Sequence, residues 1–184
     1  RASVRGGESA IGNLIADAMR AVVGADVALT NGGGIRGDRT YRAGTMLSRK
    51  DVLGELPFGN VTVLLEVSGA ELRAALENGV SRIEDTAGRF PQVSGLKFVY
   101  DTKAPPGSRL LEVEVGGKPL DPARRYRLAT NDYIARGGDG YAVLKGAKRL
   151  IDASGAKLMA TMVMDFIAAR ESVAPKVEGR ILAK

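Results

Sequence analysis

Apolar residues in the first part of the chain recur with helical spacing and then form a continuous run. Residues 8–23 carry them three or four positions apart, which is typical of one buried face of a helix. Ser9 is a candidate N-cap for this helix, and Gly24 is a candidate stop. The apolar run DVALT follows at 26–30. The pattern therefore predicts a helix followed by a short buried strand.

A similar order of elements is expected further along. Residues 48–54 predict a short helix capped by Ser48, and residues 61–67 form an apolar strand. The tetrapeptide Ser-Gly-Ala-Glu at 68–71 fits a capping box, in which the first side chain and the fourth satisfy free backbone N–H groups. We therefore expect a second amphipathic helix directly after this strand.

Strands dominate the middle of the chain, where turns rich in Gly and Pro separate them. In the second of these strands, alternation places Leu111, Val113 and Val115 on one face. The expected elements are strands at 93–100, 109–115 and 125–131, a helix at about 155–170, and a closing strand in VEGRIL at 177–182.

The mixture of helices, strands and hairpins predicts an α+β (mixed α/β) fold, with mixed β-sheet layers covered by helices. No long linker or internal repeat divides the sequence, so residues 1–184 are expected to form a single domain. No apolar run approaches the ~20 residues needed to span a bilayer, so we expect no membrane partner.

Composition excludes several kinds of chemistry. The chain has no His and no Cys, so a Ser-His-Asp or Cys-His nucleophile, the usual zinc and haem ligand sets, and disulfides are all absent. The 27 Lys and Arg residues exceed the 21 Asp and Glu residues, giving a net charge of +6. The basic residues are spread in short groups without an aromatic-interleaved stripe, which favours a solvated surface or a small anionic ligand over nucleic acid.

A glycine-rich loop, NGGGIRG, follows the first predicted strand at 31–37. It satisfies G-x-G-x-x-G, but the next residues lack the helical pattern that a dinucleotide-binding motif requires. Glycines such as Gly33 would let backbone N–H groups approach an anion, with Asn31 and Arg36 adding polar and charged contacts. A plain glycine turn with a solvated arginine explains the same residues.

A second glycine-rich loop, YIARGGDGY at 133–141, combines aromatic residues with an acid. Tyr133, Tyr141 and Phe58 all lie beside Gly or Pro in predicted loops, where core packing is a weaker explanation for them. Such rings suit stacking against a flat ligand, and Asp139 suits the paired hydroxyls of a ribose. Plugging of the core by Phe58 and Tyr133 is the alternative.

Five segments taken together resemble the C-terminal domain of the 5′-nucleotidase family, which includes ecto-5′-nucleotidase and bacterial UDP-sugar hydrolase. They occur in the family's order and spacing, and they cover nearly the whole chain. They are ESAIGNLIADAM near the start, NGGGIR at 31–36, LPFGN at 56–60, YRLATNDYIARGGDGY at 126–141, and VEGRI near the end.

The resemblance implies roles for particular residues in binding a nucleotide. Phe58 and Tyr133 match the two aromatic residues that sandwich the base, although Phe is more usual in the family at position 133. Asp139 matches the carboxylate that holds the ribose hydroxyls.

The same resemblance assigns polar contacts around the base and the phosphate. Asn31 and Arg36 match residues that contact base and phosphate, and Gly33 lies in the same loop. Arg5 matches a second phosphate-binding arginine, although its glycine-flanked context makes the match weaker. Asn60 matches a polar neighbour of the base in the bacterial enzymes.

The resemblance also implies what this chain does not carry. In the family, an N-terminal metallophosphoesterase domain binds two divalent metal ions and performs hydrolysis. We therefore expect no catalytic residue, no metal and no other cofactor within residues 1–184, and no hydrolysis by the isolated chain. The expected partners are a nucleotide or nucleoside and that N-terminal domain in cis, in a periplasmic or extracellular setting.

Two alternatives remain open from the sequence. The same domain could serve a UDP-sugar hydrolase, a 2′,3′-cyclic-nucleotide phosphodiesterase or an enzyme of sulfur-oxidation intermediates, because base choice depends on a few polar contacts. It could also be a stand-alone, non-catalytic nucleotide-binding module.

Overall fold

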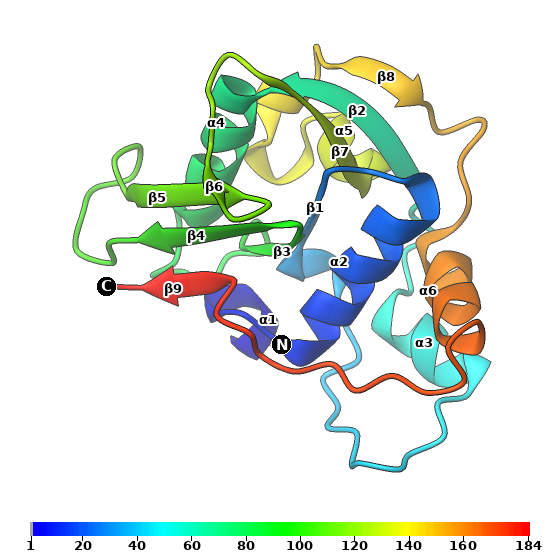
Figure 1. The fold of residues 1–184 in the computed structure, drawn as a ribbon. Helices are drawn as coiled ribbons and strands as arrows, with labels where there is room; N and C mark the ends of the chain where they lie inside the picture. The colour runs from blue at the N-terminus through cyan, green and yellow to red at the C-terminus, as the bar shows by residue number, and fades with distance from the viewer. Residues whose placement is uncertain (1) are drawn as a thin grey trace.

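Two β-sheets carry the fold in the computed structural model, which describes residues 2–184 (Figure 1). The larger sheet has the order β3-β1-β7-β2-β8, and the smaller has the order β6-β5-β4-β9. The pairs β1–β7 and β4–β9 are parallel, and the other pairs are antiparallel. The strands are β1 Val27–Asn31, β2 Thr62–Ser68, β3 Pro91–Ser94, β4 Leu96–Tyr100, β5 Leu110–Val115, β6 Lys118–Pro119, β7 Arg125–Asn131, β8 Lys148–Ile151 and β9 Ile181–Ala183.

Helices cover both faces of the larger sheet. They are α1 Ala2–Gly6, α2 Ala10–Val23, α3 Arg49–Glu55, α4 Gly69–Val80, α5 Asp132–Ala135 and α6 Met159–Ala168, with short 3-10 turns η1 Gly32–Gly34, η2 Gly138–Gly140 and η3 Ala142–Leu144. Along β1, Val27 and Leu29 face a core shared with α4 and the smaller sheet, whereas Ala28 faces a second core formed with α2, α3 and α6. The expected α+β fold is confirmed.

Several local signals in the sequence predicted the helix ends correctly. The Ser9 hydroxyl accepts a hydrogen bond from the Gly12 N–H at the start of α2, and Gly24 ends that helix with a φ of 61°. Ser48 and Ser68 both form complete capping boxes, at the starts of α3 and α4 respectively. No helix among residues 2–184 combines the length and the apolar content needed to cross a membrane.

The single strand expected at 93–100 is wrong, because the chain bends at Gly95. The residues on either side belong to β3 in the larger sheet and to β4 in the smaller one. Gly95 has a φ of 76°, in the region that favours glycine, and the space where a Cβ would stand is occupied by the Asp26 carbonyl oxygen. One glycine therefore passes the chain from one sheet to the other.

The face expected for the strand at 109–115 holds for Val113 and Val115, which pack on one core, but is wrong for Leu111. Leu111 is exposed, while Leu110 and Val113 are buried. The pairing of β4 with β5 shifts register between Val99 and Tyr100, so Leu111 is left as an extra residue between the pairs Val99–Glu112 and Tyr100–Leu110. The irregularity breaks the simple alternation on which the expectation depended. The short strand β8 and the short helices α1 and α5 had no clear signal in the sequence.

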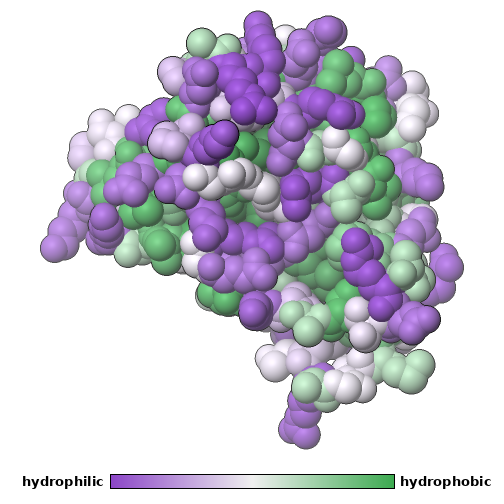
Figure 2. All heavy atoms as spheres, in the orientation of Figure 1, coloured by the Kyte–Doolittle hydropathy of each residue, from purple (hydrophilic) through white to green (hydrophobic). Residues whose placement is uncertain are grey.

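Charged side chains are spread over the surface. Figure 2 shows hydrophilic residues across most of the face drawn, over both sheets and helices, with hydrophobic residues in separate patches between them. This arrangement agrees with the scattered basic groups in the sequence.

Replacing Gly95 with Ala should lower the free energy of unfolding by about 3 kcal/mol, because the methyl group would overlap a backbone oxygen and the backbone would be strained. Urea denaturation measures this loss. Gly117→Ala is a matched control, since Gly117 has the same φ of 76° and open space around it. It should cost only about 1 kcal/mol. Equal losses for the two variants would contradict this explanation of the bend.

Candidate functional site

The sheet topology brings three motifs to one edge of the larger sheet. Because β1 and β7 are parallel neighbours, they end together, at Asn31 and Asn131. The antiparallel strand β2 begins there, with Thr62 opposite Asn131, and β3 begins there with Pro91 opposite Asn31. The segments NGGGIR, LPFGN and NDYIARGGDGY therefore meet at this edge.

A chain of hydrogen bonds between side chains links two of these motifs. The Ile134 N–H donates to Oδ1 of Asn131 at 2.9 Å, and Nδ2 of Asn131 donates to Oδ1 of Asn31 at 3.0 Å. Nδ2 of Asn31 then donates to Oδ2 of Asp139 at 2.6 Å. Both asparagines are buried. Asn31 and Asp139 are candidates in the sequence, but Asn131 is not; its signal is its place at the end of a buried strand within the NDY motif.

Asp139 is held on all sides by hydrogen bonds. Its other carboxylate oxygen accepts from the Tyr133 hydroxyl at 3.1 Å, and its N–H donates to that hydroxyl at 3.2 Å. Its carbonyl oxygen accepts from Nδ2 of Asn78 at 3.2 Å, and Arg89 donates to Oδ1 of Asn78. Burial and the nearby Asp139 charge raise the pKa of Tyr133 above its usual value, which keeps the hydroxyl protonated. Neither Asn78 nor Arg89 was singled out from the sequence.

The aromatic residues divide into two exposed rings and one buried ring. Phe58 is 59% exposed and Tyr133 is 43% exposed, so neither fills the core. The Tyr133 ring lies against Gly138, where a Cβ would overlap it, so one face of this ring is covered by backbone. Tyr141 is fully buried and donates to the carbonyl oxygen of Arg89. The expectation that core packing explains Tyr141 poorly is therefore wrong.

Asn60 joins the segment that carries Phe58 to the segment that carries Tyr133. Its Nδ2 donates to Oδ1 of Asp132 at 3.0 Å, and Asp132 also pairs with Arg136 at 2.7 Å. Burial alone would raise the pKa of Asp132, but hydrogen bonds from Asn60 and the Val61 N–H, together with Arg136, hold it below its usual range. This contact fixes the two aromatic segments relative to each other.

The glycine loop does not offer its N–H groups to an anion in the way its sequence suggests. The N–H of Gly32 donates to the carbonyl oxygen of Phe90, and that of Gly33 donates to the carbonyl oxygen of Gly88, both at 2.7 Å. A Cβ on Gly33 would stand 2.9 Å from the Gly88 Cα. The glycines therefore allow close backbone packing between two loops, and this explanation replaces the proposed N–H cradle.

The two candidate phosphate-binding arginines both lie near this loop, one in a helix that packs against it and one directly after its glycines. The Arg36 guanidinium stands 5.4 Å from the centre of the Phe58 ring, and its Nη1 makes a long 3.5 Å hydrogen bond to the Gly33 carbonyl oxygen. Arg5 belongs to α1, which packs against η1. Within the described residues, the buried Nε of Arg5 has no hydrogen-bond partner. Both arginines thus lie near the Asn31 motif.

An open pocket of about 130 Å³ lies beside Phe58. It brings Phe58 and Asn60 together with Asn131 and Gly34, whereas Tyr133, Asp139 and Arg5 do not line it. Among residues 2–184, no three Asp, Glu, His or Cys side chains gather in a group that could hold a metal ion. The resemblance places the two-metal centre in an N-terminal domain, and the described residues supply no such group of ligands.

Comparison with solved structures gives a close match over the whole fold. A crystal structure of a 5′-nucleotidase precursor from Thermus thermophilus matches with a TM-score of 0.90 and 43% sequence identity. The match covers 99% of this chain and 36% of that one.

Sequence relatives lead to the same group of proteins. The chain is 37% identical to the trifunctional nucleotide phosphoesterase protein YfkN of Bacillus subtilis, over 98% of this chain and 13% of that protein. It is 35% identical to a 5′-nucleotidase of Diplobatis ommata, over 97% of this chain and 34% of that enzyme. The similar proteins are thus nucleotide phosphoesterases and 5′-nucleotidases, of whose length this chain spans about a third or less.

A family model described as the C-terminal domain of 5′-nucleotidases matches residues 1–146. This chain belongs to that family, which confirms the resemblance seen in its motifs.

Asp132→Asn should destabilise the chain by about 1–2 kcal/mol at pH 7, because the paired carboxylate is lost and Arg136 is left without its partner. The folded-state pKa of Asp132 is depressed, so its stabilisation is present above the unfolded value and is lost as pH falls through the folded value. The difference from the wild type should therefore shrink below about pH 4. Urea titrations from pH 7 to pH 3 measure it, and a difference that grows on acidification would contradict the assignment.

Proposed function

We propose that this chain is the nucleotide-binding domain of a two-domain, metal-dependent 5′-nucleotidase-like phosphoesterase that hydrolyses nucleoside 5′-monophosphates. The supporting observation is the pair of exposed rings, Phe58 and Tyr133, on segments joined by the Asn60–Asp132 hydrogen bond at one sheet edge. In the proposed complex the base stacks between these two rings.

Stacking explains why two aromatic rings remain in water. One face of Tyr133 is covered by Gly138, so the ring presents a single free face, and Phe58 stands on the short segment that follows α3. Each base stacked on an aromatic side chain gains ~1–3 kcal/mol. A base that enters between the rings would remove apolar surface from water on both sides.

The sugar and phosphate have matching partners next to the rings. Asp139 carries a carboxylate already oriented by Asn31 and Tyr133, and its remaining lone pairs would accept hydrogen bonds from ribose hydroxyls. Arg36, beside Phe58, would offset the charge of the phosphate, and Arg5, in the helix that packs against the glycine loop, would add to it. Asn31 and Asn60 complete the proposed contacts, while Gly33 holds the glycine loop against Gly88.

Hydrolysis itself is assigned to a domain outside this chain. The proposed N-terminal metallophosphoesterase domain would hold two divalent ions and supply a metal-activated water, while this chain presents the ester to it. On this proposal residues 1–184 alone bind nucleotide without cleaving it, and the whole protein acts in the periplasm or outside the cell. Relatives named as snake venom 5′-nucleotidases support that setting.

Other nucleotide esters are a second candidate class of substrate. The relative YfkN is named as a trifunctional nucleotide phosphoesterase, and stacking accepts any base because every base has a π-face. A UDP-sugar or a cyclic nucleotide would use the same rings.

Replacing either ring with Leu should weaken AMP binding by about tenfold or more, because a flat stacking surface is lost. Isothermal titration of the 184-residue chain with AMP measures the effect for Phe58→Leu and Tyr133→Leu. Phe166→Leu is a matched control, since this ring on α6 packs against Arg170 away from the sheet edge. It should leave the affinity within about twofold.

Two results would overturn the proposal. One is unchanged AMP affinity in both ring variants, which would remove the stacking role. The other is release of phosphate from AMP by the isolated chain at an enzymatic rate with Mn²⁺ or Zn²⁺, which would place catalysis within these residues.

A further inference from the structure

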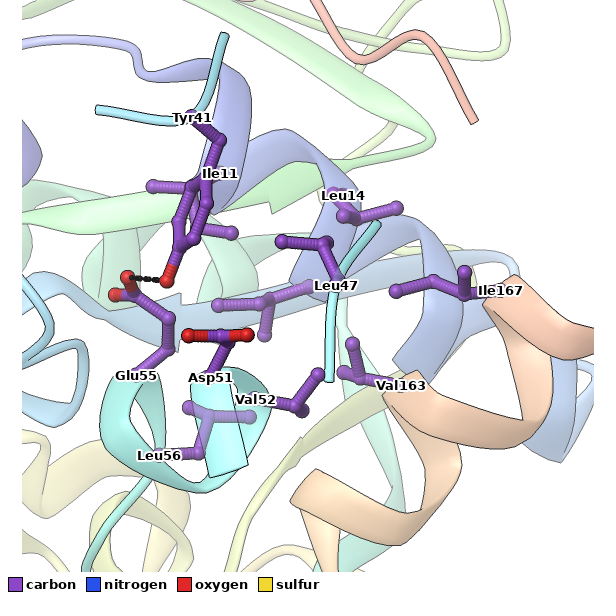
Figure 3. Close-up of a pocket in the computed structure, with 11 residues that line it drawn as sticks. Ile11, Leu14, Tyr41, Leu47, Asp51, Val52, Glu55, Leu56, Val163 and Ile167 are labelled. Atoms are coloured by element: carbon purple, nitrogen blue, oxygen red, sulfur yellow. Dashed lines mark hydrogen bonds between the residues drawn. The ribbon is translucent and has the colours of Figure 1, made fainter. Parts of the chain in front are cut away.

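A buried carboxylate lies next to the segment that carries Arg36. Glu55 is the last residue of α3 and only 5% exposed. Its Oε2 accepts from the Gly37 N–H at 3.0 Å, its Oε1 accepts from the Tyr41 hydroxyl at 2.8 Å, and its carbonyl oxygen accepts from the Arg36 N–H at 2.9 Å. Figure 3 shows the Tyr41 contact as a dashed line, at one side of a pocket between α2, α3 and α6. One residue thus holds three points of the loop that follows the glycines.

The loop is shaped to pass directly over this carboxylate. A Cβ on Gly37 would overlap the Glu55 carboxyl group, so only glycine lets the backbone N–H approach so closely. A buried carboxylate is costly unless it is hydrogen-bonded, and both of its oxygens here have a donor. Packing alone does not require an ionised group at this position, so the three contacts need another explanation.

The direction of Arg36 depends on these contacts. Its own side chain is weakly anchored, with a 3.5 Å hydrogen bond to the Gly33 carbonyl oxygen and a 5.4 Å approach to the Phe58 ring. Its backbone, in contrast, is fixed by the Glu55 carbonyl oxygen and, one residue later, by the Glu55 carboxylate. Glu55 and Tyr41 together form a clamp on the loop at residues 36–41. Glu55 stands three residues before Phe58, so one short segment carries both part of this clamp and the ring.

We propose that Glu55 and Tyr41 are positioning residues that hold Arg36 over the Phe58 ring, so that its guanidinium meets the phosphate of a stacked nucleotide. The inference rests on the proposed function, and it adds the determinant that separates a nucleotide from a nucleoside. Neither residue touches the ligand. They act through the backbone of residues 36 and 37, which is set before any ligand arrives.

Charge and protonation suit this role. Burial, the hydrogen bond to Glu55 and the charge of Glu55 together raise the pKa of Tyr41 to about 12. The hydroxyl therefore stays a donor across the physiological range. The other nearby charges act in opposite senses, since Asp51 also raises this pKa while Arg39 lowers it.

The test compares two ligands that differ only in the phosphate. The 184-residue chain is titrated with AMP and with adenosine by calorimetry, as wild type, Glu55→Gln and Tyr41→Phe. AMP affinity should fall about tenfold in Glu55→Gln and severalfold in Tyr41→Phe, while adenosine affinity stays within about twofold. Arg42→Ala is the matched control, because it removes an exposed positive charge from the same loop without touching the clamp. It should leave both affinities nearly unchanged.

Amide hydrogen exchange at residue 37 gives a second readout that needs no ligand. In Glu55→Gln the Gly37 amide, whose acceptor is the Glu55 carboxylate, should exchange at least tenfold faster, while amides in β1 and β7 stay protected. Equal losses of AMP and adenosine affinity, or unchanged exchange at this amide, would overturn the positioning role. Failure of the wild type to bind either ligand would overturn the proposed nucleotide function, whereas the exchange result would still decide whether the clamp orders the loop.

The clamp also predicts a dependence on alkaline pH. The folded-state pKa of Tyr41 lies above its ordinary value of 10.0, so the stabilisation from the protonated hydroxyl is complete below pH 10 and is lost as pH rises toward 12. The difference in urea midpoint between wild type and Tyr41→Phe should therefore be constant from pH 7 to pH 9 and shrink above pH 10. A constant difference up to pH 12 would show that the hydroxyl does not donate to Glu55.

Discussion

The hydrogen bond between the buried side chains of Asn131 and Asn31 is the contact on which the arrangement of the candidate site depends. A backbone N–H, that of Ile134, occupies Oδ1 of Asn131, so the amide nitrogen of Asn131 must face Asn31. Asn31 then presents its oxygen to Asn131 and its nitrogen to the Asp139 carboxylate. One backbone N–H therefore sets the direction of each hydrogen bond in this series, because a side-chain amide accepts only at its oxygen and donates only at its nitrogen. The parallel pairing of β1 and β7 makes the contact between the two asparagines possible, because both strands end at the same level.

Local signals in the sequence predicted a large part of the fold, and the exceptions have a common cause. The capping boxes of Ser48 and Ser68 each involve contacts within four residues, so the local sequence is enough to predict them. The bend at Gly95 depends on Asp26, nearly seventy positions away, and the burial of Tyr141 depends on the carbonyl oxygen of Arg89. Contacts between segments distant in the sequence leave no periodic pattern, and neither does a register shift such as the one at Tyr100.

The candidate site shows the same division. Motif order and residue type indicated Asn31, Asp139, Phe58 and Tyr133. In the structure, Asp139 accepts hydrogen bonds from both Asn31 and Tyr133. What the sequence could not supply was the set of supporting partners. Asn78, for example, comes from a helix that contributes no candidate residue of its own. Supporting residues are recognisable only when the elements that carry them have been placed in space.

The glycines of the loop at 31–37 have a different physical role from the one that their sequence suggests. Consecutive glycines suggest an anion cradle, yet the N–H groups of Gly32 and Gly33 are occupied by the loop at 88–90. The glycines let the backbone at Gly33 approach the backbone at Gly88 closely, and Gly88 also lies next to the Asp139 carboxylate.

The backbone of Asp139 adopts a conformation that glycine adopts more readily than most other residues. This residue has a φ of 52°, in a region that costs most side chains ~1 kcal/mol, and glycines occupy both neighbouring positions. Glycine at position 139 would satisfy the same turn without strain. Folding alone would therefore favour a fourth glycine over a charged side chain, and a carboxylate there also needs two donors to orient it. The side chain at this position is oriented by Asn31 and Tyr133, at the sheet edge where the rings of Phe58 and Tyr133 are exposed.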